Sequence, residues 1–232
     1  MYFINASWDH ILKKIVFITT SFADKGPNQQ LLNIIKRLDR KQFKPVLISL
    51  TNPIKGDKYN FFKKLEIDIH FLGVKKLTAI FSFIRLKKLL SRLEPQLIHS
   101  HGFLPDLIII LTRINIPHIL TIRCDPYIDY PTKFGLILGN IMASIHIVVI
   151  RLCPLAIACS ESLQLTFKNY NVNTKVVRNG VDPEFISDDF EVKSSDQKVP
   201  IFITAGSLIP RKNVELMISI FCSDELRNKV KF

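Results

Sequence analysis

Short apolar runs rich in β-branched residues alternate with amphipathic segments along most of the chain. Residues 15–18 are apolar at every position, which suits a strand whose sheet is covered by helices on both faces. The predicted strands are Lys14–Thr19, Pro45–Leu50, Asp68–Leu72, Leu97–Ser100, His118–Ile122, Leu155–Ala158 and Lys175–Val177. The predicted helices are Gln29–Leu38, Thr78–Leu93, Pro105–Arg113, Lys133–Ile150 and Glu161–Tyr170. This alternation predicts an α/β fold built on a Rossmann-like, doubly wound parallel sheet.

The chain changes character after the turn dipeptide Asn179-Gly180. Residues 183–200 are polar and acidic and show neither helical nor strand periodicity. A strand at Ile201–Ala205 and a helix from Asn213 to about Leu226 follow. Roughly 30 residues cannot bury an apolar face of their own, so we expect the start of a second, incomplete Rossmann-like domain. The alternative is that this strand and helix extend the first sheet.

The predicted domain division follows from this change in composition after Gly180. It comprises an N-terminal extension over residues 1–12, a first domain over 13–185, a linker over 186–200 and the start of a second domain, truncated, over 201–232.

Charge and cysteine content narrow the class of protein. Thirty-two Lys and Arg against 20 Asp and Glu give a formal net charge of +12, which attracts phosphates, nucleic acid or an anionic membrane. No nucleic-acid-binding motif occurs, so we expect no nucleic-acid partner.

Four cysteines form no C-x-x-C pair, namely Cys124, Cys153, Cys159 and Cys222. They predict reduced, buried thiols of a cytosolic protein, with disulfides or metal ligands as the alternative.

Two further patterns concern targeting. The first 12 residues lack the basic cluster and apolar stretch of a secretory signal. The longest apolar stretch, residues 134–159, is interrupted by polar residues and a proline. It predicts a buried helix and a buried strand in place of a membrane span.

Polar residues stand where two predicted strands end. Alternation places His99 and His101 on the same side of their strand, with His101 at the carboxyl edge. Two histidines without a third ligand do not make a zinc site; His101 either faces a cleft or is a loop histidine beside a core one. Arg123 follows the next strand and could clamp a phosphate or carboxylate. A structural contact between Arg123 and Asp125 is the competing interpretation.

The loop at residues 21–29 joins the first strand to a helix whose free N–H groups suit an anion or sugar hydroxyls. Gly26 lies in this loop, and a plain connection capped by Asn28 is the alternative. The loop is neither G-x-G-x-x-G nor a P-loop, which argues against a nicotinamide cofactor. We expect no cofactor and no metal.

A second group of cations lies on one stripe of the helix predicted at Thr78–Leu93, formed by Arg85, Lys88 and Arg92. This stripe fits an anionic membrane surface or is the solvated face of an ordinary crossover helix. Later in the chain, Gly206 is followed by the adjacent cations Arg211 and Lys212 just before a helix. That combination favours a diphosphate; plain exposed loop charges are the alternative.

Five segments in order carry a resemblance to a known family. They are Gly26-Pro27, His99-Ser100-His101-Gly102, Ile157–Ser162, Val176–Asp182 and Gly206–Asn213. Together they resemble the GT-B glycosyltransferases of family 4, retaining transferases that act on sugar nucleotides. The stretch from Arg123 to Tyr130, followed by Gly135, is similar to a subgroup often found in bacterial polysaccharide assembly.

The resemblance implies two facing Rossmann-like domains, with the acceptor held by the first and the nucleotide sugar by the second. The implied reaction moves a sugar, from a UDP-sugar donor, to a glycan or lipid-linked acceptor in surface polysaccharide synthesis such as lipopolysaccharide or capsule. The implied place is the cytoplasm, with peripheral contact at the inner face of the membrane. The alternative is a non-catalytic acceptor- or membrane-binding remnant, or half of a split enzyme.

The resemblance also assigns roles to residues. Lys212, assisted by Arg211, neutralises the leaving diphosphate near Gly206. Gly26 lies near the donor phosphates or the acceptor, and Ser160 and Asn179 border the cleft between the domains. The catalytic residue is not assigned; Arg123 and His101 are the candidates.

Three departures from the family pattern qualify these roles. Ser207 stands where many members have an arginine, and Arg123 stands where many have a cleft histidine. In the family, a distal E-x7-E segment carries the carboxylates that bind the ribose and the sugar of the donor. That segment would lie beyond residue 232, so we expect little transfer by these residues alone.

Overall fold

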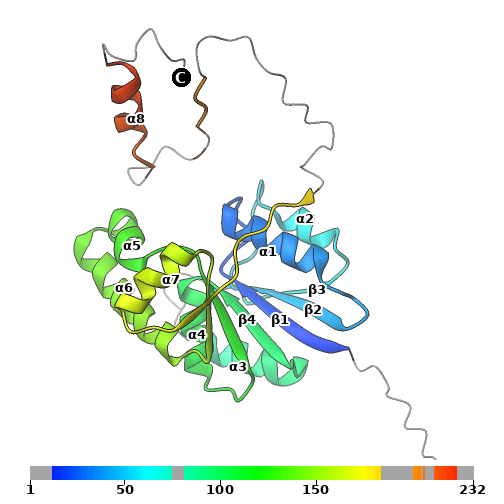
Figure 1. Cartoon of the computed structure of the whole chain (residues 1–232). Helices are drawn as coiled ribbons and strands as arrows, with labels where there is room; N and C mark the ends of the chain where they lie inside the picture. Colours follow the sequence, from blue (N-terminus) through cyan, green and yellow to red (C-terminus); the bar gives the residue numbers. More distant parts are fainter. Residues whose placement is uncertain (1–11, 75–80, 184–200, 205, 207–211, 224–232) are drawn as a thin grey trace, which may run out of the picture.

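The computed structural model describes residues 12–74, 81–183, 201–204, 206 and 212–223. The strands are β1 Lys13–Thr19, β2 Phe43–Ser49, β3 Asp68–Phe71, β4 Leu97–His101, β5 His118–Ile122, β6 Leu155–Ala158 and β7 Thr174–Val176. They form one parallel sheet in the order β3-β2-β1-β4-β5-β6-β7 (Figure 1). The α/β fold class is confirmed, and each predicted strand of the first domain is present within two residues of its predicted bounds.

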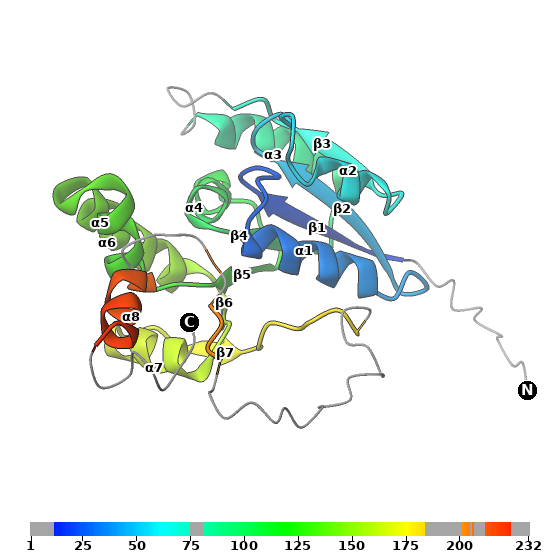
Figure 2. The same cartoon turned by 90° about the horizontal axis from the view of Figure 1, so that it is seen from above.

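Helices cover both faces of this sheet. The helices of the described structure are α1 Gly26–Arg37, α2 Tyr59–Lys63, α3 Ser82–Leu93, α4 Phe103–Thr112, α5 Pro126–Phe134, α6 Leu136–Leu152, α7 Glu161–Asn169 and, apart from the sheet, α8 Val214–Phe221. Seen from above, α1 and α2 lie on one side of the sheet, and α3, α4 and α6 lie on the other (Figure 2). Phe17 and Leu31 belong to the core on the α1 side, whereas Val16 and Leu86 belong to the core on the α3 side.

The strand order reverses between β1 and β4. The chain proceeds outward from β1 to β3 and then returns to place β4 on the other side of β1. The connections after β1 and β4 therefore run to opposite faces and leave a crevice at the carboxyl edge, where ligands of open α/β sheets bind. Thr19 and His101 are paired at this edge.

The helix predicted over Lys133–Ile150 is present as α6, which begins at Leu136 and ends at Leu152. The helix α5 before it was not predicted; the two antiparallel helices meet at Gly135, where φ is +82°. That backbone conformation ends a right-handed helix and suits glycine. A Cβ added at Gly139 would lie 2.4 Å from the Cα of Pro131, so the two helices cross in close backbone contact. We name this pair the α5–α6 hairpin.

Other local expectations also change. Helix α2 was not predicted, because its five residues are too short to show a helical period. Asn28 does not cap α1; the cap position is Lys25, which makes no side-chain cap hydrogen bond. The four cysteines are free, but Cys222 is exposed and only Cys153 is fully buried.

The start of the predicted second domain is only partly described. The expected strand at Ile201–Ala205 is reduced to a single bridge residue at Ile201, and residues 202–204 are irregular. Helix α8 has no buried residue, and the seven-stranded sheet includes no strand from this region. The predicted extension 1–12, apart from Leu12, and the predicted linker 186–200 lie outside the described residues, so the domain division stays a prediction. No helix in the described part of the chain is both long and apolar enough to cross a membrane.

Candidate functional site

Two adjacent imidazoles, tilted by 35° to each other, form the centre of the candidate site. His99 and His101 alternate along β4, and their ring centroids are 4.1 Å apart, which confirms the predicted shared side. Phe17 of β1 lies against both rings, at 5.6 Å from His99 and 6.3 Å from His101. Nε2 of His99 is 2.8 Å from Oγ1 of Thr121 on β5. The imidazoles therefore sit on the α1 side of the sheet, at its carboxyl end.

His101 is buried without a partner for its ring. It is 6% exposed, and neither ring nitrogen has a hydrogen bond to any described residue. Burial, followed by the charges of His99 and Arg123, lowers the pKa of His101 well below its usual range. Burial, followed by the charges of Arg123 and His118, lowers the pKa of His99 to about 3. Both imidazoles are neutral at pH 7, and His101 offers one N–H donor and one nitrogen acceptor to a ligand.

Arg123 lies at the end of β5 with its guanidinium only partly used. Its Nη1 donates to Oδ1 of Asn179 at 2.9 Å. Its Nε and Nη2 atoms are buried and have no hydrogen-bond partner among the described residues. These two atoms form one edge of the guanidinium, which matches a carboxylate or phosphate with two parallel hydrogen bonds. Burial lowers the pKa of Arg123, but an arginine stays charged in proteins.

The alternative interpretation, a structural contact between Arg123 and Asp125, is not observed among the described hydrogen bonds and ion pairs. Asp125 accepts hydrogen bonds from the backbone N–H of Tyr127 at 3.0 Å and from the hydroxyl of Tyr170 at 2.9 Å. It therefore caps α5. Sequence reasoning placed Asn179 at the same cleft but missed that it holds Arg123 directly.

The segment after β7 crosses to α1 and lies over this region (Figure 1). We name residues 177–183 the strap. The carbonyl of Gly180 accepts from Nε2 of Gln30 at 2.9 Å. The buried carboxylate of Asp182 binds Lys36 at 3.0 Å and Arg37 at 2.5 Å. An open groove of about 370 Å³ lies between the strap and α1, lined by residues of those two segments but not by Asn179 or Arg123. The contacts of Gly180 and Asp182 hold the strap on α1, and Asn179 of the strap lies beside Arg123.

The other residues predicted for the cleft have different surroundings. Gly26 begins α1, is exposed, and has open space where a Cβ would point. The loop before it is held by Asn28, whose amide donates to the carbonyls of Ser21 at 2.8 Å and Ala23 at 2.7 Å. Ser160 caps α7 by accepting from the N–H of Leu163 at 3.2 Å, which gives it a structural role.

The predicted donor-phosphate residues are only partly described. Gly206 and Lys212 are exposed, and a Cβ built on Gly206 would lie 3.9 Å from Cε of Lys212. Arg211 and Ser207 lie outside the described residues. The structure thus brings Gly206 and Lys212 close to each other.

The predicted basic stripe lies on the outer face of α3. Arg85, Lys88 and Arg92 are exposed, while Leu86 and Leu90 on the opposite side are fully buried. Helix α3 is a crossover helix between β3 and β4, so both interpretations of the stripe remain compatible with its place.

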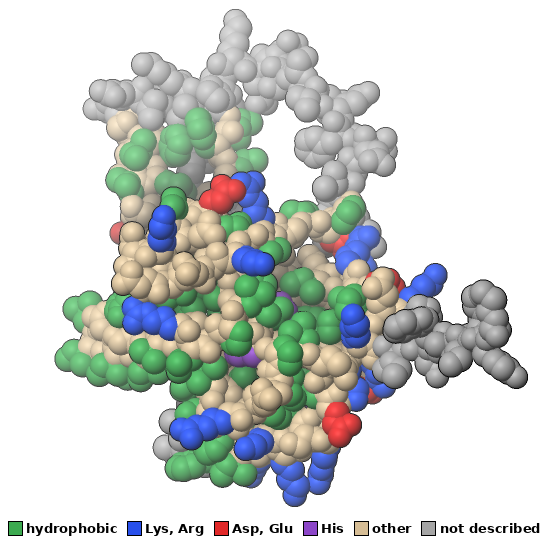
Figure 3. Space-filling view, turned by 60° about the horizontal axis from the view of Figure 1, so that its bottom comes forward, with side chains coloured by type: hydrophobic (Ala, Val, Ile, Leu, Met, Phe, Trp, Pro, Cys, Tyr) green, Lys and Arg blue, Asp and Glu red, His purple; other side chains and the backbone are tan. Residues whose placement is uncertain are grey.

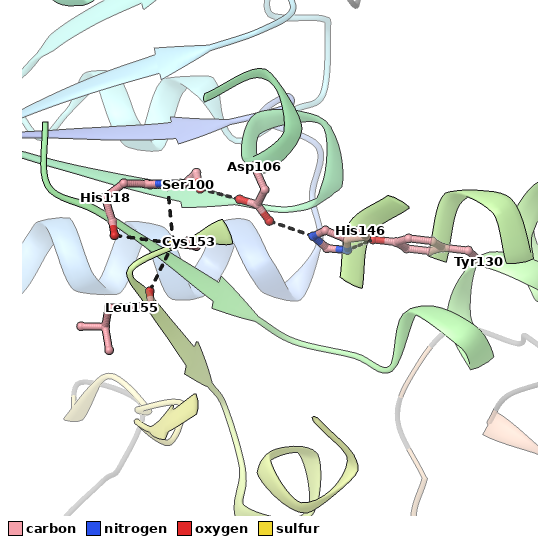
Figure 4. Close-up of polar contacts among 7 residues, drawn as sticks. All are labelled: Ser100, Asp106, His118, Tyr130, His146, Cys153 and Leu155. Atoms are coloured by element: carbon pink, nitrogen blue, oxygen red, sulfur yellow. Dashed lines mark hydrogen bonds and ion pairs between the residues drawn. The ribbon is translucent and has the colours of Figure 1, made fainter. Parts of the chain in front are cut away.

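A second polar cluster was not predicted from the sequence. It is buried on the α4 side of the sheet and joins Ser100, Asp106, His118, Tyr130, His146 and Cys153 (Figure 4). The Asp106 carboxylate accepts from the Ser100 hydroxyl at 2.5 Å and pairs with Nε2 of His146 at 3.0 Å. The Ser100 oxygen is 2.7 Å from Nε2 of His118.

The hydrogen bonds of this cluster are mutually satisfied. When Nε2 of His146 donates to Asp106, its Nδ1 accepts from the hydroxyl of Tyr130 at 2.7 Å. Burial lowers the pKa of His118, and burial raises the pKa of Cys153 to about 11. A thiol held protonated in a closed network is not a nucleophile. The cluster is therefore a structural joint between the sheet and the α5–α6 hairpin, because it connects β4 and α4 with both hairpin helices.

Comparisons with known proteins agree with this architecture. The family model Glycosyltransferase Family 4 matches residues 25–185. The chain therefore belongs to glycosyltransferase family 4, a family of enzymes. A comparison with curated protein sequences finds no significant match.

Solved GT-B structures share the fold at low sequence identity. Sucrose-phosphate synthase from Thermosynechococcus elongatus has 8% identity and a TM-score of 0.58, over 95% of this chain and 70% of that one. Anabaena HepE, solved with UDP and glucose, has 14% identity and a TM-score of 0.53, over 95% and 68%. The lipopolysaccharide outer core galactosyltransferase WaaB has 13% identity and a TM-score of 0.53, over 81% and 51%. At these identities the likeness concerns the fold alone.

Proposed function

We propose that the chain supplies the acceptor-side domain of a retaining glycosyltransferase. It moves a sugar from a UDP-sugar to a glycan or lipid-linked acceptor in bacterial surface polysaccharide synthesis. The observation that carries this proposal is the free guanidinium edge of Arg123 beside the unpartnered, neutral ring of His101 at the carboxyl edge of the sheet. Family membership supports sugar transfer. The UDP in the HepE structure and the lipopolysaccharide substrate of WaaB support the donor and the process.

The two side chains suit different parts of the reaction. The guanidinium of Arg123 stabilises negative charge, either on the leaving diphosphate or on a phosphate carried by the acceptor. The neutral ring of His101 can hydrogen-bond a sugar hydroxyl or accept its proton. Asn179 acts as a positioning residue, because its hydrogen bond fixes the plane of the Arg123 guanidinium.

The donor side of the proposal involves residues 206–212. Lys212, assisted by Arg211, neutralises the diphosphate that leaves when the glycosidic bond of the donor breaks. Gly206 allows the backbone to approach that diphosphate closely. The acceptor hydroxyl supplies the new oxygen bond to the anomeric carbon, and its proton is released.

The place of reaction in this proposal is the inner face of the cell membrane. The basic stripe of α3, formed by Arg85, Lys88 and Arg92, contacts anionic headgroups. In vesicle co-sedimentation, replacing all three by alanine should remove the dependence of binding on anionic lipid. Binding that stays equally dependent on anionic lipid would contradict this part.

The test of the main proposal is a transfer assay on a longer polypeptide that adds a complete donor domain to these residues, with labelled UDP-glucose, UDP-galactose and UDP-N-acetylglucosamine, and a panel of dodecyl glycosides and dodecyl diphosphate sugars. We expect labelled lipid product in which the donor's anomeric configuration is retained. Arg123→Ala should lower the rate by roughly 100-fold. The matched control is Arg40→Ala, an exposed arginine after α1 whose guanidinium donates to the carbonyl of Ile35, and it should keep the wild-type rate. Inversion of configuration, or equal rates for Arg123→Ala and wild type, would contradict the proposal.

Helix α8 favours a second candidate function. Its apolar side chains Leu216, Ile218 and Ile220 are exposed, so they need an apolar partner surface that the described residues do not provide. In this alternative the chain binds the acceptor while a separate polypeptide supplies the donor site. Saturable binding of a dodecyl diphosphate sugar, with neither UDP binding nor transfer, would support the alternative over the main proposal.

A further inference from the structure

The α5–α6 hairpin presents an apolar face that no described residue covers. On α6, an outward stripe repeats every three or four residues and consists of Ile137, Ile141, Ile145, Val148 and Leu152. Ile137 is 81% exposed and Ile141 is 52% exposed. The opposite side of α6 is buried in the core. A helix that is apolar on both sides is normally buried on both sides, so this face has a partner outside the described structure.

Helix α5 extends the same apolar surface. Ile128 and Phe134 are exposed by about half, and its acidic residue Asp129 is buried and paired with Lys133. Figure 3 shows hydrophobic side chains along the edge where the hairpin projects from the molecule. The surface is therefore continuous over both helices of the hairpin.

The exposed charges within the helices of this side are cationic, and the carboxylate of Asp125, which caps α5, is partly buried and bonded to Tyr170. Helices α3, α4, α5 and α6 expose no acidic side chain within their bounds, because Asp106 and Asp129 are both buried. The charged residue of α6 is Arg151, near its end. Glu94 is exposed but follows α3 beyond its last residue. A partner for this side of the molecule must accept apolar side chains and cations together.

The hairpin and the basic stripe lie on one side of the molecule. Helix α4 packs against both α3 and α6, and Figure 2 shows the three helices on the same side of the sheet. Helix α3 also exposes Ile84 beside Arg85 and Lys88, and Phe81 just before its first residue is exposed as well. The combination of cations and apolar side chains on one side matches an anionic lipid surface. Two copies of the chain joined through this side would place like charges opposite each other.

We propose that the apolar face of the α5–α6 hairpin inserts into the interfacial layer of an anionic bilayer. The basic stripe of α3 contacts headgroups on the same side. This inference deepens the proposed function and rests on it for the membrane contact of α3. Helix α5 begins at Pro126, three residues after Arg123, so the hairpin follows directly along the chain from the strand end that carries Arg123.

The first test compares two matched double variants of the full chain in vesicle flotation. Vesicles contain phosphatidylcholine alone or with about 30% phosphatidylglycerol. Ile137→Gln with Ile141→Gln should weaken binding to the anionic vesicles on the order of 100-fold. The control, Ile34→Gln with Ile54→Gln, alters exposed isoleucines on α1 and in the loop after β2, and should bind like wild type. Circular dichroism verifies that both variants are folded.

The second test detects insertion directly. The lone tryptophan of the sequence, Trp8, is changed to phenylalanine, and a new reporter is introduced as Ile141→Trp or, for the control, Ile34→Trp. Phosphatidylglycerol with brominated acyl chains should quench the Ile141→Trp fluorescence and leave Ile34→Trp unchanged. Equal quenching of both, or of neither, would overturn the inference.

The outcomes separate this inference from the proposed function. If the alanine variant of the α3 stripe loses binding while the hairpin variant binds like wild type, the hairpin inference fails and the proposed membrane contact stands. If the hairpin variant instead abolishes a dimer seen in sedimentation and wild type binds no vesicles, the face is an interface between copies and the inference is overturned. Transfer to water-soluble acceptors tests the enzyme proposal without any membrane.

Discussion

The buried imidazoles at the end of β4 should make the protein less stable in mild acid. His99 is 7% exposed, and its pKa is lowered to about 3, mainly by burial and then by the charges of Arg123 and His118. The unfolded chain binds a proton at the ordinary value of 6.5, while the folded chain binds it only near pH 3. Between these values the unfolded state holds more protons, so the free energy of unfolding falls as the pH falls from 6.5 towards 3. Above pH 6.5 this contribution is constant.

The magnitude follows from the two pKa values of His99. Lowering the pH from 7.5 to 5.0 should reduce the free energy of unfolding by about 2 kcal/mol for this imidazole alone. His101 acts in the same direction, since its pKa is also lowered. Urea unfolding followed by circular dichroism at both pH values measures the difference.

The variant His99→Gln isolates this effect. Glutamine keeps an amide that can bond Thr121 but does not titrate, so the loss of stability between pH 7.5 and 5.0 should be smaller than in wild type by about 2 kcal/mol. His70→Gln on β3, outside the histidine cluster, is the matched control. An unchanged pH dependence in His99→Gln would refute the assignment of this effect to the buried pair.

Two further predictions concern the hairpin and the strap. Gly139→Ala should destabilise the protein by about 1–3 kcal/mol in urea unfolding, because the new methyl group would clash with the backbone of Pro131; a stability equal to wild type would show that the helices separate freely. Asp182→Ala should cost about 1–2 kcal/mol, because it removes charge-assisted hydrogen bonds to Lys36 and Arg37. Hydrogen exchange of the variant should be faster than that of wild type in the strap and unchanged in β1. If the strap exchanged at the wild-type rate, Asp182 would not hold the strap.

The sequence predicted the sheet well because parallel strands buried on both faces leave an obvious apolar signal. Residues 15–18 and 46–48 are fully apolar, and they form the adjacent strands β1 and β2, both inside the sheet. The placement of His99 and His101 on one side followed from strand alternation alone. Their shared burial and the free ring of His101 could not follow, because these depend on Phe17 and Thr121 from other strands.

The errors arose where tertiary contacts override local pattern. The helix predicted at residues 133–150 is present as α6, but the preceding helix α5 was missed, because it is held against α6 by the contact between Gly139 and Pro131, which the local pattern does not show. Asp106 looked like an ordinary polar residue of α4, since its partners Ser100 and His146 lie on separate elements. A buried polar network leaves no spacing signature in the sequence. Its one hint was a histidine, His146, inside an otherwise apolar helix.

The contrast between the two faces of the sheet matters for function. On the α4 side the polar cluster is hydrogen-bonded throughout, whereas on the α1 side His101 and Arg123 keep buried donors that no residue in the described part of the chain pairs with. An unpaired buried donor lowers stability, and such strain is typical of sites that complete their hydrogen bonds with a ligand.

The most direct test of this account is the nitrogen NMR spectrum of the histidine rings during ligand titration. The chain is labelled with ¹⁵N histidine, and His101→Gln assigns the signals of His101. We expect both ring nitrogens of His101 to report a neutral imidazole at pH 7 and to shift on addition of UDP-glucose or a dodecyl diphosphate sugar. Arg123→Ala should weaken that response. If both ligands leave the His101 signals unchanged at millimolar concentration, or shift only those of His70, the carboxyl edge is not the substrate site and the account is wrong.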